Sequence, residues 1–317
     1  MTDDGEHDET ALPPDDVFGL LGNETRIEIL SALGEAGEPL GFSALHDRVD
    51  MRDSGQFNYH LEQLVGHFVR KTADGYTLTR MGRRVIEAVL SGTVTETPTM
   101  ERTPVAESCE YCGGAMEISW QGGSVRMYCT ECAGRYGHAR AGDGGSVSSA
   151  EGYLGRLPLP PAGVHGRTPV ERLRAAWTWG NLEVAALSTG ICPRCSATVE
   201  TTVTVCESHD AGEGLCDACL RADAIEVKFA CTNCIYESGG AATAALYANT
   251  ELLAFLTAHG LNPIAPDSIH ALNSTLQNYE EEILSTDPLR ARLTFGVDGE
   301  TLALTVDEEL TVVESAR

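Results

Sequence analysis

Apolar residues recur at helical spacing near the start of the chain. Between residues 54 and 68 they follow an i, i+4, i+7, i+11 spacing, which places them on one stripe of a helix. The residues of this stripe are Phe57, Leu61, Leu64 and Phe68. A shorter stripe precedes it at 42–49, and two extended runs follow it around Asp74-Gly75, a tight-turn dipeptide. This order of helix, turn, helix and hairpin predicts a winged helix-turn-helix.

Helical patterns also flank this motif on both sides. One covers residues 17–33 and stops at Gly34, and the other covers 81–90 and stops at Gly92. We therefore predict one DNA-binding domain over residues 15–92. Residues 1–14 are acidic and poor in apolar side chains, which predicts a disordered tail.

The second helix of the motif carries polar residues beside its apolar stripe. In a winged helix-turn-helix this helix enters the major groove, where amides pair with adenine edges, and nearby cations meet phosphates. The expected base contacts are Gln56, Asn58, Tyr59 and His60. The expected phosphate contacts are Arg52, Arg70, Lys71 and Arg80. A solvated polar face without a ligand is the alternative interpretation.

Three stretches in this region resemble the ArsR-like winged-helix repressors. They are LGNETRIEILSAL at 21–33, NYHL in the second helix and DGYTLT in the hairpin. The family pattern L-x-x-x-x-R-x-x-I-L is matched by Leu21, Arg26, Ile29 and Leu30. The resemblance implies a homodimer on double-stranded DNA, with the outer helices as its seam; packing of those helices inside a monomer is the alternative.

Two departures limit what this resemblance implies. Residues 17–90 contain no Cys, whereas metal-sensing members carry cysteines on or beside their DNA-binding helices. The resemblance therefore does not extend to metal sensing of that type. Asn58 stands where the family carries Ser, which leaves the pattern of base contacts open.

Cysteine pairs with two intervening residues dominate the middle of the chain. Cys109/Cys112 and Cys129/Cys132 are separated by a stretch long enough for a hairpin. Two such pairs supply the tetrahedral set of four sulfurs that structural zinc prefers. We therefore predict a zinc ribbon over residues 108–140, in which a closed four-ligand site has a structural role.

A second array of paired ligands follows a predicted helix, which begins at the capping-box sequence Thr168-Pro169-Val170-Glu171. Its pairs are Cys192/Cys195, Cys206/His209, Cys216/Cys219 and Cys231/Cys234. The chain's 11 cysteines and His209 thus provide ligands for up to three Zn²⁺ sites. Within residues 168–238 the pairs can combine with their neighbours or alternate, and the extended runs between them favour neighbours.

The C-terminal region, residues 239–317, predicts a small α+β unit. A short helix, a second helix over 267–284 and three alternating runs with Asp298-Gly299 at a turn follow one another. Residues 93–107 and 141–167 have the Thr/Pro-rich or Gly/Ser-rich composition of linkers and extended segments. The predicted fold class is therefore multidomain α+β.

The net charge of the chain indicates the salt conditions in which the protein works. The net charge is −25, from 22 basic and 47 acidic residues, and only two of the basic residues are lysines. This balance resembles proteins of salt-loving archaea, and an acidic bacterial protein from a GC-rich genome is the alternative. In about 1 M salt the Debye length falls to about 3 Å, so the overall negative charge hardly repels DNA. Residues 41–90 are nearly neutral, because seven basic residues accompany six acidic ones.

Other function classes lack a sequence signal. There is no apolar run that spans a membrane and no export signal at the acidic N-terminus, which predicts a cytoplasmic protein without a membrane partner. Disulfides are rare in the cytoplasm, so we expect the cysteines to bind metal instead. Because no metalloprotease, hydrolase, dinucleotide or P-loop motif occurs, we do not expect an enzyme.

The whole layout resembles a family of haloarchaeal ArsR-like regulators, through LPLPPAG, AAWTWGNLE, ICPRC and NYEEEILSTDP. It implies no particular ligand or target. We predict a sequence-specific DNA-binding transcription regulator whose zinc modules are structural or bind an effector or protein partner. One alternative is a basal-transcription adaptor, since a winged helix before a zinc ribbon resembles the large subunit of general transcription factor E. Another is a zinc- or redox-responsive sensor.

Overall fold

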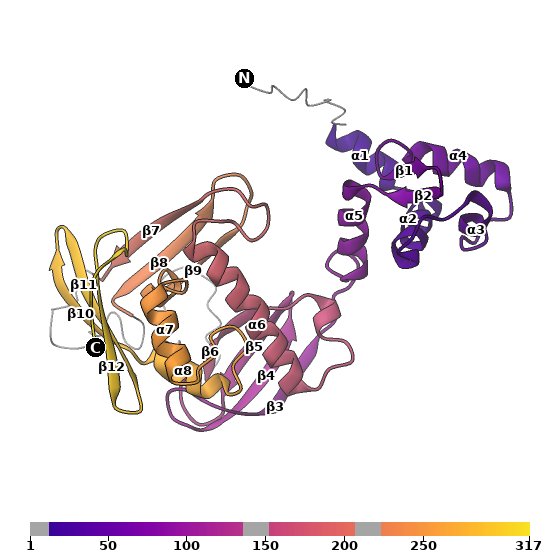
Figure 1. Ribbon diagram of the computed structural model, residues 1–317. Helices are drawn as coiled ribbons and strands as arrows, with labels where there is room; N and C mark the ends of the chain where they lie inside the picture. The colour runs from indigo at the N-terminus through magenta and orange to yellow at the C-terminus, as the bar shows by residue number, and fades with distance from the viewer. Residues whose placement is uncertain (1–12, 136–151, 207–222) are drawn as a thin grey trace, which may run out of the picture. The chain divides into compact units, whose positions relative to one another are not determined.

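Two separate hydrophobic cores organise the chain. The structure is a computed structural model that describes residues 13–135, 152–206 and 223–317. It divides into two compact units, Met1–Glu96 and Thr97–Arg317, each with its own cluster of buried side chains (Figure 1). Helices and several small antiparallel sheets make up both units, so the coarse α+β prediction is confirmed.

The N-terminal unit is mainly helical. Its elements are α1 Pro14–Leu21, α2 Glu24–Ala36, α3 Phe42–His46, α4 Ser54–Leu64, β1 Val69–Thr72, β2 Gly75–Leu78 and α5 Arg80–Leu90. The helix predicted over 17–33 is broken, because the Asn23 side chain accepts a hydrogen bond from the Arg26 backbone and caps a new helix. The predicted stripe is confirmed for Phe57, Leu61 and Leu64, which are fully buried on α4, whereas Phe68 is buried but lies beyond the end of the helix.

The hairpin differs from the sequence prediction at its turn. Thr72 pairs with Gly75, so the turn residues are Ala73 and Asp74 rather than Asp74-Gly75. Gly75 begins β2 with a φ of 135°. A Cβ at this position would lie 2.4 Å from the Leu40 carbonyl oxygen, so only glycine permits the bridge between Leu40 and Tyr76.

The first sheet of the C-terminal unit has the order β3-β4-β5-β6. Its strands are β3 Met100–Ser108, β4 Ala115–Gln121, β5 Ser124–Cys129 and β6 Tyr153–Pro158. The linker prediction for 93–107 is therefore wrong where β3 lies, whereas β6 is the extended part of the segment predicted over 141–167. These are the outer strands of the sheet, and an outer strand tolerates Pro104, which lacks an N–H to donate.

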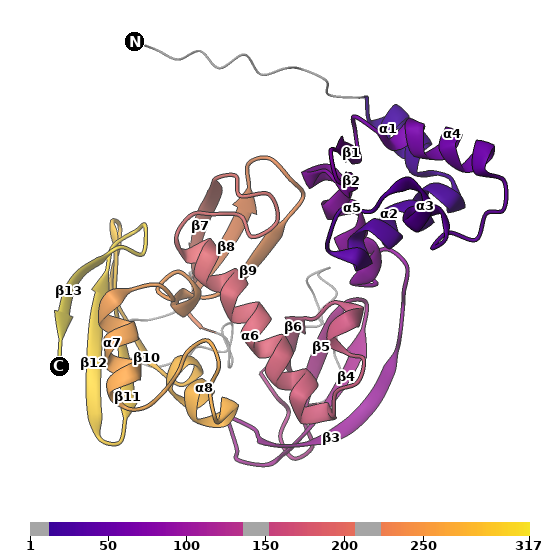
Figure 2. The same ribbon diagram turned by 45° about the vertical axis from the view of Figure 1, so that its right-hand side comes forward.

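Helix α6, Pro169–Ser188, packs against this sheet (Figure 2). The predicted capping box is confirmed, because Thr168 and Glu171 bond each other's side chain and backbone. The helix ends with Gly190 at a φ of 77°, and the Ile191 N–H donates to the Ala186 carbonyl. This ending directs the chain straight into Cys192.

Two more sheets complete the unit. One has the order β7-β8-β9, and the other has the order β10-β11-β12-β13. The remaining elements are η1 Pro161–Gly163, β7 Val199–Val205, β8 Ile225–Cys231, β9 Glu237–Ala241, η2 Ala242–Ala244, α7 Thr250–Ala258, α8 Ile269–Gln277, β10 Glu280–Thr286, β11 Leu289–Val297, β12 Glu300–Val306 and β13 Val312–Ala316. The helix predicted over 267–284 stops early, and its last residues form β10 instead.

The boundary predicted at residue 239 falls inside a sheet. β9 pairs with β8, so residues on both sides of this boundary share one layer. The predicted meander is confirmed in β11 and β12, where Leu293, Phe295, Leu302 and Leu304 are fully buried. Over the described ranges, no helix has both the length and the apolar character to cross a membrane.

Candidate metal centres and candidate nucleic-acid interface

The first cysteine group lies where the β3–β4 turn meets the end of β5. Cys109 Sγ lies 3.8 Å from Cys132 Sγ, and Cys112 Sγ lies 3.5 Å from Cys129 Sγ. All four sulfurs lie within 4.8 Å of one another, as the sequence predicted. The backbone N–H groups of Glu131 and Cys132 each donate to Cys129 Sγ at 3.3 Å, which favours its thiolate.

The second group joins the two ends of a β-hairpin. Cys192 Sγ lies 3.7 Å from Cys234 Sγ, and Cys195 Sγ lies 3.5 Å from Cys231 Sγ. The backbone N–H groups of Cys234 and Asn233 donate to Cys231 Sγ and lower the pKa of this thiol to about 6. The group therefore has a thiolate ready at neutral pH.

This geometry corrects the predicted pairing of the second array. We predicted that neighbouring pairs combine, with alternating pairs as the alternative, but the structure combines the outermost pairs, Cys192/Cys195 and Cys231/Cys234. The reason is the register of β7 and β8, in which Val199 faces Cys231. Of the inner ligands, Cys206 follows β7, while His209, Cys216 and Cys219 lie outside the described residues.

Both groups fit a tetrahedral metal ion held by four thiolates. A metal–sulfur bond of about 2.3 Å, as in zinc sites, implies sulfur–sulfur edges of about 3.8 Å. The four distances of 3.5 to 3.8 Å agree with that edge. A disulfide is excluded at each of them, because its sulfurs lie about 2.0 Å apart.

A buried polar network lies beside the first metal group. Arg135, three residues after Cys132, bonds Asp223 and Gln277. Glu281 on β10 accepts the backbone N–H of Ala224 at 2.6 Å. Burial, and then the nearby Asp223 carboxylate, raises the pKa of Glu281 to about 7. Sequence reasoning missed this network because its members come from distant segments without a shared motif.

The predicted DNA contacts lie just before α4 at Arg52, on α4, on the hairpin and on α5. The Asp53 side chain caps α4 by accepting the N–H groups of Gly55 and Gln56, at 2.8 and 3.1 Å. Seven of the eight residues are exposed, namely Arg52, Gln56, Asn58, Tyr59, Arg70, Lys71 and Arg80. The eighth, His60, is half-buried, and its Nδ1 is buried without a hydrogen-bond partner within the described ranges.

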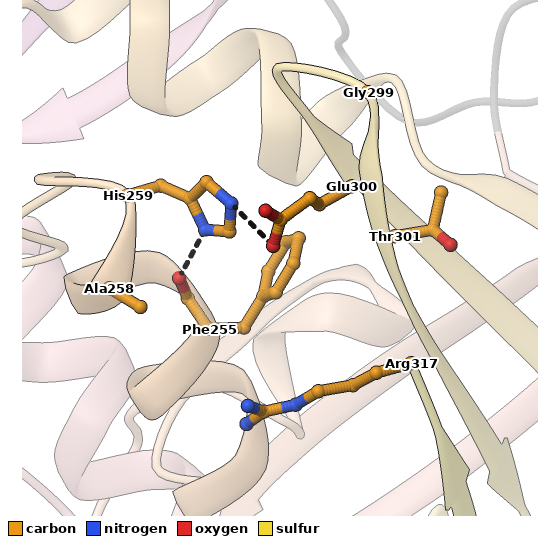
Figure 3. Close-up of a pocket in the computed structure, with 7 residues that line it drawn as sticks. All are labelled: Phe255, Ala258, His259, Gly299, Glu300, Thr301 and Arg317. Atoms are coloured by element: carbon orange, nitrogen blue, oxygen red, sulfur yellow. Dashed lines mark hydrogen bonds and ion pairs between the residues drawn. The ribbon is translucent and has the colours of Figure 1, made fainter.

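A pocket of about 300 Å³ lies between the end of α7 and the start of β12 (Figure 3). Its polar groups already contact one another or a neighbour. His259 Nδ1 lies 2.8 Å from the Phe255 carbonyl oxygen, and Nε2 lies 3.4 Å from Glu300. Arg317 pairs with Glu251 at 3.3 Å. We therefore assign this pocket no ligand.

Family comparisons divide the chain much as its two cores do. Residues 14–89 match the family model described as a domain of unknown function (DUF7347). Residues 106–312 match a second domain of unknown function (DUF7351). The second match covers more than half of the sequence, and with its paired-cysteine groups the chain belongs to the DUF7351 family. No curated protein and no solved structure matched.

Proposed function

We propose that this protein is a sequence-specific DNA-binding transcription regulator whose N-terminal unit is a winged helix-turn-helix. The observation that carries the proposal is the exposed face of α4. Gln56 and Asn58 are exposed there, and Tyr59 keeps 61% of its surface accessible, while the opposite stripe is fully buried. A helix whose apolar side is packed into the core and whose exposed side carries amides is suited to read base edges in a major groove.

The hairpin and α5 supply the second part of the proposed interface. Arg70 and Lys71 are exposed on β1, and Arg80 begins α5. The Lys71 ammonium lies 5.5 Å from the Tyr76 ring centre, which holds the side chain against the hairpin. These cations are suited to meet phosphates on either side of the groove, with His60 supporting α4 from its half-buried position.

We further propose a homodimer that covers exposed apolar side chains on the outer helices of this unit. Phe18 on α1 is 73% exposed, and Leu90 on α5 is 56% exposed. The resemblance to ArsR-like repressors implies a dimer seam on these outer helices, and a dimer there would cover both side chains. A dimer would place two α4 helices on a palindromic site.

The proposed role of the cysteine groups is to bind zinc structurally. Four thiolates close the coordination sphere, so the ion would cross-link strands rather than expose a position for chemistry. Because the outermost pairs combine, Cys206, His209, Cys216 and Cys219 are the ligands left for the third predicted zinc ion, and of these only Cys206 lies in the described part of the chain. Elemental analysis tests this count, with three zinc ions per chain as the expected result.

Selection of DNA from a random pool, in molar KCl, tests the proposed function. The full chain should enrich a palindromic motif, and an Asn58→Ala/His60→Ala variant with unchanged zinc content should not. Absence of enrichment by the wild-type chain would contradict sequence-specific regulation. It would favour a basal-transcription adaptor, which stable co-purification with RNA polymerase would then identify.

A further inference from the structure

One face of the β3–β6 sheet carries an unusual set of arginines. The opposite face contributes Ile118, Trp120 and Val125 to the core under α6. Because side chains alternate along each strand, Arg126 and Tyr128 of β5 point away from that core. The set consists of Arg102, Arg126 and Arg156, and we call it the arginine face.

Strand register brings two of these arginines together. Arg126 and Arg156 are directly paired residues on β5 and β6, so their side chains leave the same face side by side. Two like charges in this position repel each other and destabilise the sheet unless an anion lies between them. Within the described residues, no member of the arginine face has a carboxylate at ion-pair distance. Arg126 Nε is also buried without a hydrogen-bond partner in those residues.

Arg102 is held in place by an aromatic ring. Its guanidinium carbon lies 3.6 Å from the centre of the Tyr128 ring, and that ring lies 5.6 Å from the Tyr153 ring. A guanidinium stacked in this way keeps the N–H donors at its edges available. Stacking also removes much of the entropy that an exposed arginine would lose on binding. Arg102 is thereby prepared to donate to an anion.

The arginine face contrasts with the acidic composition of the whole chain. The sequence has 47 acidic and only 22 basic residues, yet three arginines gather on one small sheet. Two acidic residues lie close to the arginine face in sequence or register: Glu101 precedes Arg102, and Glu117 is paired with Tyr128. A repeating polyanion complements several neighbouring cations better than a single anion does, and each guanidinium can bind one phosphate bidentately.

We propose that the arginine face binds the phosphodiester backbone of DNA, as a second contact beyond the base-reading helix. The inference rests on the proposed function for its choice of polyanion. Residues 91–99 alone separate α5 from β3. Duplex held by the N-terminal unit is therefore tethered by a short linker to the unit that carries the arginine face, which raises its local concentration.

The test compares two variants of the full chain that lose the same charge. R102Q/R126Q/R156Q removes the arginine face, and R290Q/R292Q/R317Q removes three arginines from the C-terminal sheet. Affinity for a long duplex of mixed sequence is measured by fluorescence anisotropy over the KCl range in which circular dichroism shows folded protein. Zinc content and melting temperature verify both variants.

The first variant should bind at least about tenfold more weakly, and its salt slope should fall by about 2.7, since each lost phosphate contact contributes about 0.9. The second should match the wild type. Equal losses in both variants would show a net-charge effect and overturn the proposal. Unchanged slopes in both would overturn it as well and would assign the arginine face to an acidic protein partner.

The outcome is separable from that of the proposed function. Sequence preference is measured on the same preparations with the selected motif and a scrambled duplex. A wild type without preference defeats the proposed regulator, yet the difference in salt slope between the two variants still decides the role of the arginine face. Failure of the wild type to bind any duplex would overturn both.

Discussion

The two units of this protein each have a hydrophobic core, and they differ in what accompanies it. The N-terminal unit buries Ile29, Phe57, Leu61 and Phe68 completely and contains no cysteine. In its described residues the C-terminal unit also has three small sheets, two of which end at a group of four thiols that could hold a metal ion. The difference suggests that a helical core closes on its own, whereas a metal bound at each thiol group would cross-link the ends of short hairpins.

The two cysteine groups extend this comparison within one unit. In the first, Cys109 and Cys129 belong to the buried core, whereas in the second only Cys192 is buried and Cys195 is exposed. The first group is therefore part of the packing around Trp120. The second clamps the open end of the β7–β8 hairpin at the surface.

The largest expected effect comes from removing a predicted metal ligand, which should unfold one unit and leave the other folded. Cys129→Ser removes a buried ligand of the first group, and structural zinc supplies on the order of 10 kcal/mol of folding free energy. We expect the C-terminal unit to unfold while the N-terminal unit stays folded. All three tryptophans, at 120, 177 and 179, lie in the C-terminal unit, so their fluorescence should shift to the red.

Chelation of the wild-type protein should reproduce this shift, and added zinc should reverse it. Limited proteolysis provides the matching readout for the N-terminal unit, which should remain resistant. Tryptophan emission that stays unchanged after complete zinc removal would contradict the structural role of the metal.

The converse change breaks the other unit. Phe57→Ala leaves a cavity in the N-terminal core and should cost about 3–5 kcal/mol of its stability. Proteolysis should then cut the N-terminal unit, whereas zinc content and tryptophan emission should stay at wild-type values. Loss of zinc in this variant would show that the two cores do not fold independently.

A smaller effect concerns pH. The folded-state pKa of Glu281 is about 7, above its ordinary value of 4.5, so the folded state retains a proton that the unfolded state releases. This contribution to stability is complete below about pH 4.5 and is lost as the pH rises through about 7. Glu281→Gln should therefore make the decline in Tm between about pH 4.5 and pH 7 shallower. Burial also raises the pKa of Asp223, so part of the decline in Tm should remain in this variant.

The control for this variant is Glu282→Gln on the same strand, where the carboxylate forms a surface pair with Arg292 at 2.7 Å. Its pH profile should follow the wild type. Both profiles are recorded on zinc-saturated protein by scanning calorimetry. If the Tm of Glu281→Gln fell with pH as steeply as that of the wild type, the assignment of this pH dependence to Glu281 would be contradicted.

The sequence predicted most where one local rule decided the structure. The stripe of Phe57 and Leu61, the cap at Thr168 and the cysteine group at 109–132 each follow from spacing alone. Strand β3 was missed because its Thr and Pro residues have the composition of a linker, although an outer strand accepts them. The pairing of Cys192 with Cys234 was missed because hairpin register decides it.

The contacts of the candidate interface show the same limit. Exposure of Asn58 followed from helical periodicity, because this residue lies off the apolar stripe. The arginine face did not, since Arg102, Arg126 and Arg156 share no motif and meet only through the register of the sheet.

The most direct test of the central claim measures binding of two variants to a selected motif and to each of its single-base changes. Asn58→Ala should lose discrimination at one base position and leave the others intact, because an amide pairs with one base edge. Lys71→Ala should weaken every duplex alike, because a phosphate contact carries no sequence information. Uniform weakening by both variants would contradict base readout by α4.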